Sequence, residues 1–129
     1  MFAGAETLTV YVVDDEPSIA DLMSRILGEA GFQVTTFYSG SEVLQLSHPL
    51  PDVLVTDFAM PGVDGASLAM WLQHHHPKCR VIMVSGNPAN VPRYLWQQVP
   101  SLTLLQKPID SASLIAAVRG ETDKKARTA

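Results

Sequence analysis

Five short runs of apolar, mostly β-branched residues alternate along this sequence with helical patterns, and this alternation constrains the fold more than any other feature. The runs lie at residues 8–13, 33–38, 52–56, 80–84 and 102–106. Runs of this length are typical of strands, and strands separated by helices form parallel sheets that are covered on both faces. The sequence therefore predicts an α/β fold with a five-stranded parallel sheet.

Residues that start and stop helices stand between these runs. Pro17 suits the first turn of a helix that would end before Gly31, and Asp64 and Asp110 are suited to cap two later helices. Gly120 marks the expected end of the last helix. The predicted apolar face of the first helix comprises Ile19, Leu22, Met23, Ile26, Leu27 and Ala30.

The connection between the fourth and fifth runs, residues 87–100, departs from this regular pattern. Pro88, Pro92 and Pro100 interrupt it, so any helix there is expected to be short, from Pro92 to Val99. Residues 121–129 have no apolar face and are expected to form a flexible tail. Residues 1–120 then make up a single domain.

Composition limits where the protein works and what it binds. Hydrophobic residues make up 47% of the 129, which is enough for one core, and the net charge of −4 argues against a surface that grips nucleic acid. One cysteine excludes an internal disulfide and fits a reducing compartment. No signal peptide or long apolar run is visible, so we expect a cytoplasmic protein with no membrane segment and no direct contact with nucleic acid.

Charged and polar residues follow four of the five expected strands. Asp14 and Asp15 follow the first run, Asp57 the third, Ser85 the fourth and Lys107 the fifth. Ligands of parallel α/β sheets bind outside the carboxyl ends of the strands, so these residues are candidates for one site. Clustered carboxylates suit Mg²⁺, and a carboxylate can attack a phosphoryl group for which an ammonium and a hydroxyl are suitable donors.

Four segments carry these residues: VVDDEP at 12–17, TDFAMPGVDG at 56–65, VSG at 84–86 and LLQKPI at 104–109. Together, in this order, they resemble the receiver domain of bacterial two-component response regulators. The resemblance extends over residues 7–120. It implies a flavodoxin-like, doubly wound (βα)5 fold with the strand order 2-1-3-4-5.

The resemblance also implies a role for each strand-end residue. Asp57 would be the phosphoacceptor, which takes a phosphoryl group from a histidine kinase or a histidine phosphotransfer protein. Ser85 would contact the phosphoryl group and Lys107 would pair with it. The implied magnesium ligands are Asp15 and Asp57 directly, Asp14 largely through water, and the backbone carbonyl of Ala59.

Two departures from the family pattern concern the readout of the signal. Receivers usually carry an aromatic residue three places before the lysine, and here Leu104 stands there. The proline-rich connection replaces a regular fourth helix. Both departures fall on the face that many receivers use to form homodimers or to engage targets. Any movement of Ser85 would have to be absorbed by residues 86–100.

Several functions remain open on the sequence alone. The preferred one is a phosphorylation switch, not an enzyme, whose output passes through contacts with an unspecified downstream protein. The chain would be either a stand-alone switch or part of a larger protein such as a hybrid kinase. A haloacid-dehalogenase-like phosphatase would need an acid at Ala59, and a flavodoxin would need a phosphate-binding first loop where this chain has acids. A pseudo-receiver that binds proteins without a phosphorylation cycle is kept open by Leu104.

Other chemically distinctive residues have simpler interpretations. Three consecutive histidines, His74, His75 and His76, point in different directions on a helix, so a favourable charge at the helix C-terminus is preferred over a metal site. Trp71 is expected in the core. Trp96, in the irregular connection, is either a core residue or a partner contact.

Overall fold

Five parallel strands form one sheet in the order β2-β1-β3-β4-β5, which confirms the predicted fold class. The structure is a computed structural model that describes residues 7–45 and 49–121, so the expected tail lies outside the described residues except for Glu121. The strands are β1 (Thr9–Val13), β2 (Gln33–Phe37), β3 (Val53–Asp57), β4 (Arg80–Ser85) and β5 (Thr103–Gln106). The helices are α1 (Pro17–Glu29), α2 (Gly40–Gln45), α3 (Gly65–His75), α4 (Arg93–Gln98) and α5 (Ser111–Arg119), with a short 3₁₀ helix, η2 (Pro88–Asn90).

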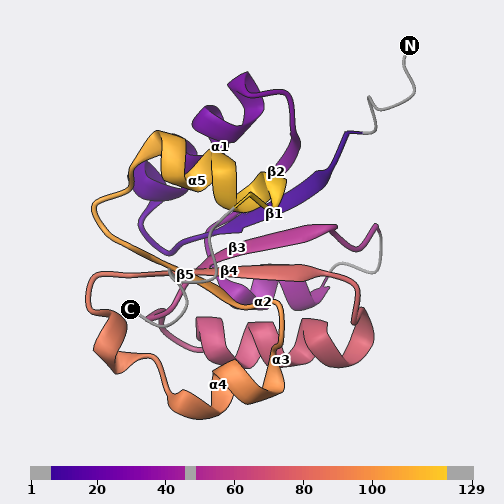
Figure 1. Ribbon diagram of the computed structural model, residues 1–129, viewed down its shortest axis with the longest axis vertical. Helices are drawn as coiled ribbons and strands as arrows, with labels where there is room; N and C mark the ends of the chain where they lie inside the picture. Colours follow the sequence, from indigo (N-terminus) through magenta and orange to yellow (C-terminus); the bar gives the residue numbers. More distant parts are fainter. Residues whose placement is uncertain (1–6, 46–48, 122–129) are drawn as a thin grey trace.

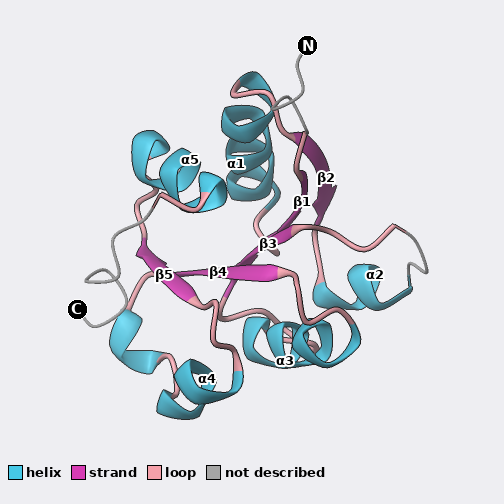
Figure 2. Ribbon diagram, turned by 45° about the vertical axis from the view of Figure 1, so that its right-hand side comes forward, coloured by secondary structure: helices cyan, strands magenta, loops and turns pink. Residues whose placement is uncertain are grey.

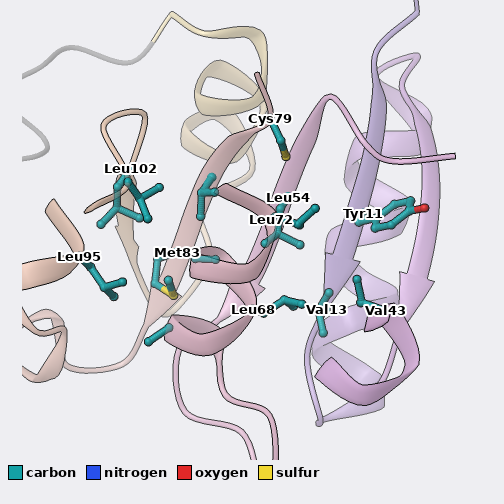
Figure 3. Packing of buried hydrophobic residues seen from close by; sticks show 14 of the residues in the cluster. Tyr11, Val13, Val43, Leu54, Leu68, Leu72, Cys79, Met83, Leu95 and Leu102 are labelled. Atoms are coloured by element: carbon teal, nitrogen blue, oxygen red, sulfur yellow. The ribbon is translucent and has the colours of Figure 1, made fainter. Parts of the chain in front are cut away.

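Helices cover the sheet on both faces. Figure 1 shows α1 and α5 on one face, and α2, α3 and α4 on the other. Alternate residues of each central strand supply the two cores, since successive side chains of a strand point to opposite faces. In β1, Val10 and Val12 pack toward α1 and α5, whereas Tyr11 and Val13 pack toward the other helices. Figure 3 shows the second of these cores, where Leu54 lies against α3 residues such as Leu72.

The central strands are continuous apolar runs because both of their faces are covered. All five residues of β3 are buried, including Asp57 at its end. The edge strand β2 instead alternates between exposed and partly buried residues over most of its length. Burial on both faces makes β1, β3 and β4 a rigid platform, and this platform carries the polar residues at the strand ends.

The predicted helix ends agree with the structure. Pro17 is the first residue of α1, and Asp64 accepts a hydrogen bond from the Ser67 N–H at 2.8 Å at the start of α3. Asp110 caps α5 in the same way through the Ser113 N–H at 2.9 Å. Gly120 ends α5 in the left-handed conformation, with φ at 82°. These signals are local in the chain, which is why the sequence predicts them well.

Leu22 was predicted on the apolar face of α1, and this prediction is wrong. It is 48% exposed, whereas Ala20, Met23 and Leu27 are fully buried. At 100° per residue, Leu22 lies roughly 130° around the helix from the centre of that buried stripe. The sequence pattern is compatible with several rotations of the helix, and packing against β1 and α5 selects the one that leaves Leu22 in solvent.

The fourth connection is irregular, as predicted. It forms η2, with Asn87 as N-cap, followed by the six-residue helix α4. Figure 2 shows α4 as a short helix next to α3 on the same face of the sheet. Val91, Leu95 and Val99 are buried and anchor this helix, and Trp96 is partly buried against the same core.

Trp71 is only partly buried, so the core position expected for it is half correct. Its ring packs at the edge of the core and stacks on the His75 ring, with 4.3 Å between the centroids. Within the described part of the chain, no helix is both long and apolar enough to cross a bilayer.

Candidate functional site

The carboxyl ends of β1, β3, β4 and β5 bring the predicted site residues together. The sheet continues slightly past the strands, because the Phe58 N–H donates to the Val84 carbonyl and the Lys107 N–H donates to the Ser85 carbonyl, both at 2.9 Å. These backbone bonds place Asp57, Ser85 and Lys107 on adjacent strands at one edge. Their positions are therefore set by the sheet and not by a flexible loop.

Three carboxylates form a cluster at this edge. Asp14, Asp15 and Asp57 each offer an oxygen within 4.8 Å of the others, and in the described residues this is the one group of three or more His, Cys, Asp or Glu side chains close enough to share a metal. Asp14 is fully buried and Asp57 is 6% exposed, whereas Asp15 faces solvent. The cluster is thus enclosed on the protein side and open on the side of Asp15.

Lys107 is the cation that faces this cluster. Its Nζ lies 3.2 Å from Asp14 Oδ2 and 3.3 Å from Asp57 Oδ1. The other oxygen of Asp14, Oδ1, accepts a hydrogen bond from the Glu16 N–H at 2.9 Å. Asp14 therefore has a partner on each carboxylate oxygen, which explains how a fully buried acid is tolerated.

Burial and neighbouring charges both shift the pKa values of the site residues. Burial, followed by the charge of Asp14, raises the pKa of Asp57, and the nearby Lys107 ammonium only partly opposes this. For Lys107 itself, burial alone would lower the pKa, but the carboxylates of Asp14 and Asp57 outweigh burial and raise the pKa above 10.5. Three carboxylates against one ammonium leave a net charge of −2 when all are ionised (−3 + 1).

The donor set of this cluster fits a magnesium ion. It consists of carboxylate oxygens, which Mg²⁺ prefers, and its exposed side leaves room for the waters that the ion keeps. A divalent cation would also neutralise the charge of −2. Asp15, Asp57 and Asp14 are the side chains that would hold it. The fourth predicted ligand, the carbonyl of Ala59, belongs to an exposed residue in the loop that follows β3.

Gly65 packs against the backbone that carries Asp57, a role that the sequence did not suggest. A Cβ at Gly65 would lie 2.3 Å from the Asp57 carbonyl oxygen and 2.9 Å from the Phe58 Cα. The Gly65 N–H donates to the Phe58 carbonyl at 2.9 Å. The first residue of α3 thus packs directly on the backbone of Asp57, and the Asp-Gly pair at 64–65 was the available signal.

Ser85 is placed beside the cluster, but its hydroxyl is engaged elsewhere. Its Oγ donates to the Asn87 carbonyl at 3.0 Å and accepts from the Asn87 N–H at 3.1 Å. Asn87 is a second residue that the sequence interpretation missed, although an Asn-Pro pair is a recognised turn signal. Leu104, three residues before Lys107, is partly buried against the core under α3 and α4.

Comparison with known proteins identifies the family. The family model for the response regulator receiver domain matches residues 10–119. The chain belongs to this family. Receiver domains act in phosphorylation-dependent signalling, interact with histidine kinases and bind Mg²⁺ at an acidic site, and Asp14, Asp15 and Asp57 form an acidic cluster in this one.

Curated relatives of this receiver domain are longer proteins. The DNA-binding transcriptional regulator NtrC of Escherichia coli K12 is 39% identical over 113 residues, which are 84% of this chain and 24% of NtrC. The transcriptional regulatory protein FixJ of Azorhizobium caulinodans is 32% identical, over 94% of this chain and 58% of FixJ. The chain therefore spans between a quarter and just over half the length of these relatives.

Solved structures support the same fold. A response regulator receiver protein from Sinorhizobium medicae is 30% identical with a TM-score of 0.77, over 90% of this chain and 94% of that one. A CheY-like receiver domain protein from Methanospirillum hungatei is 19% identical with a TM-score of 0.80, over 96% and 100%. TrrA from Thermotoga maritima, solved in complex with Mg²⁺ and BeF, is 23% identical with a TM-score of 0.78, over 90% and 100%.

Proposed function

We propose that this receiver domain is a phosphorylation-controlled switch in which Asp57 accepts a phosphoryl group from a histidine kinase or a histidine phosphotransfer protein. The observation that carries the proposal is the pairing of one ammonium, Lys107, with two buried carboxylates, Asp14 and Asp57, beside a third, Asp15. The buried position of Asp57 at a strand end favours a fixed nucleophile over a solvated surface acid.

The reaction assigned to Asp57 is a displacement at phosphorus. One carboxylate oxygen attacks, a new P–O bond forms, and the P–N bond of a phosphohistidine breaks so that the imidazole leaves with the electron pair and takes up a proton. A bound Mg²⁺ would supply positive charge to the phosphoryl oxygens during this transfer. Rigid placement of Asp57 by β3 and Gly65 limits the orientational freedom that the attacking oxygen must lose.

Lys107 and Ser85 are the residues that would respond to the new group. The Lys107 ammonium already lies 3.3 Å from Asp57 Oδ1, so it can pair with a phosphoryl oxygen after a small movement. The Ser85 hydroxyl is a further donor beside it. Phosphorylation would thus replace the present contacts of Lys107 and Ser85 with contacts to the phosphoryl group, and this change of partners is the signal.

The output of the switch is assigned to protein contacts in the cytoplasm, either by a stand-alone receiver or by a receiver within a larger protein. On this proposal the chain is a phosphoacceptor and not an enzyme. Leu104 in place of an aromatic residue supports a readout that does not depend on a ring at that position.

Intact-mass measurement with a small acyl phosphate donor tests the proposal. We expect a gain of one phosphoryl group that requires Mg²⁺ and is abolished in Asp57→Asn, because an amide is not a nucleophile. Asp52→Asn is the matched control. Asp52 is an exposed acid at the opposite end of the sheet, where its carboxylate accepts a hydrogen bond from the Thr9 N–H.

Two results would count against this function. Labelling of Asp57→Asn at the rate of the parent would show that another residue is the acceptor. No mass gain in the parent, either with the donor or with a phosphorylated histidine phosphotransfer protein, would favour the pseudo-receiver alternative.

A further inference from the structure

The hydroxyl of Ser85 has its single proton committed to the fourth connection. A serine hydroxyl donates one hydrogen bond, and here it donates to the Asn87 carbonyl at 3.0 Å. The same oxygen accepts the Asn87 N–H at 3.1 Å. Ser85 is only 5% exposed, so water competes little for these bonds. Ser85 therefore cannot donate to a group on Asp57 without giving up its bond to Asn87.

Asn87 is also the residue that closes the turn that follows. Its carbonyl accepts the Asn90 N–H at 3.0 Å, and its side-chain Oδ1 accepts the Ala89 N–H at 3.2 Å. One carbonyl oxygen thus receives both the Ser85 hydroxyl and the amide that closes η2. The state of the Ser85 hydroxyl and the order of residues 87–90 depend on the same atoms.

Buried anchors limit how far a change at Asn87 can spread. Val91 is 7% exposed, and Leu95 and Val99 are fully buried beneath α4. Before these anchors, nothing would lie within 4 Å of a Cβ at Gly86, so this part of the chain has room to move. Movement is therefore expected to end at Val91. The segment that moves is then shorter than the 86–100 segment that the sequence suggests.

We propose that Asn87 is a positioning residue that holds the Ser85 hydroxyl away from Asp57 until a phosphoryl group competes for it. This inference rests on the proposed phosphorylation of Asp57, and it adds the segment whose structure would change in response, the turn at residues 87–90. In the unphosphorylated protein, Ser85 donates to the Asn87 carbonyl and η2 is closed. When Ser85 donates to a phosphoryl oxygen instead, the Asn87 N–H loses its acceptor and the turn at 87–90 loosens.

Hydrogen exchange with and without beryllofluoride and Mg²⁺ tests this directly. We expect the Asn87 amide to exchange faster when beryllofluoride is bound, because its acceptor, Ser85 Oγ, has turned away. The amides of Leu95 and Val99 are controls, since they bond to the Pro92 and Leu95 carbonyls within the anchored helix. They are expected to keep their protection.

A double-mutant cycle tests the role of Asn87 through its side chain. Asn87→Ala removes the cap on Ala89 and loosens the turn, so the competition for Ser85 weakens and beryllofluoride binds about 2- to 10-fold more tightly. Asn87→Ser keeps a neutral capping oxygen and is expected to restore the affinity of the parent. In a Ser85→Ala background, Asn87→Ala is expected to have no effect.

The outcomes separate this proposal from the function on which it rests. If the parent binds beryllofluoride but the Asn87 amide is unchanged, the positioning role is wrong and the phosphoacceptor assignment stands. An equal affinity gain in the Ser85→Ala background would likewise show that Asn87 does not act through Ser85. If the parent does not bind beryllofluoride with Mg²⁺, both proposals fail.

Discussion

Replacing Gly65 with alanine adds one methyl group at the point where α3 meets the backbone of Asp57. The new Cβ would lie 2.3 Å from the Asp57 carbonyl oxygen, 2.9 Å from the Phe58 Cα and 2.9 Å from the Met83 Sδ. The methionine is flexible and can move aside. The other two atoms belong to the backbone at the end of a fully buried strand, so relief requires that α3 or Asp57 itself shifts.

The expected cost follows from these contacts. Adding a methyl group to a close-packed site costs about 1–3 kcal/mol, and a clash with two backbone atoms that only a shift of α3 or Asp57 can relieve places Gly65→Ala at about 2–3 kcal/mol. For a domain of this length, the melting temperature falls by roughly 3–5 °C per kcal/mol, or roughly 6–15 °C in all. A shift of Asp57 should also slow labelling by an acyl phosphate at least about tenfold, because small displacements of a nucleophile are costly.

Gly28→Ala is the matched control, since it makes the same chemical change without a clash. Gly28 lies within α1 and nothing would lie within 4 Å of its Cβ, so alanine should stabilise the helix by up to about 1 kcal/mol. Denaturant unfolding and phosphodonor labelling of both variants are the assays. If Gly65→Ala is as stable as Gly28→Ala and is labelled at the rate of the parent, the packing argument is wrong.

Three further substitutions probe the charges. Burial and Asp14 raise the pKa of Asp57, so in Mg²⁺-free buffer Asp57→Asn should be more stable than the parent at neutral pH. Denaturant titrations should show that this difference in stability shrinks as the pH falls through the raised pKa toward 3.8. The pKa of Lys107 is raised, so its ion pairs with Asp14 and Asp57 stabilise the parent fully below pH 10.5, and this stabilisation is lost as the pH rises through the raised pKa. Lys107→Met should therefore lack the decline in unfolding free energy that the parent shows at alkaline pH. Arg80 donates to the carbonyls of Ala117 and Val118, so Arg80→Met should lose about 1–3 kcal/mol in the same denaturant assay, while an unchanged midpoint would exclude this role.

Local signals explain why so much of the fold was predictable. Most of the strands are short apolar runs that contain β-branched residues, and the caps at Asp64 and Asp110 depend on an amide three residues away. The candidate site was predictable for a related reason. Once the sheet is parallel, its carboxyl ends meet at one edge, so acids that follow β1 and β3 must approach one another.

Other features depended on how the elements pack. Leu22 was assigned to a buried face, yet it is exposed because the rotation of α1 is set by its neighbours. Trp71 was expected in the core, but it lies at the edge and stacks on His75. A residue at the centre of a buried helix face and one at its border can be of the same type and fit the same helical spacing. The sequence pattern therefore does not distinguish these two positions.

The sequence by itself determined the element order, the helix ends and the set of residues at the strand ends, because each depends on interactions within a few residues. Only the tertiary structure decided that Lys107 bridges Asp14 and Asp57, that Gly65 contacts the Asp57 backbone, and that Arg80 caps α5. These contacts join β5 to β1 and β3, α3 to β3, and β4 to α5. The physical reason is distance: such pairs meet only after the sheet has formed and its helices have packed, and their geometry then depends on ångström-scale placement that a pattern of residue types does not contain.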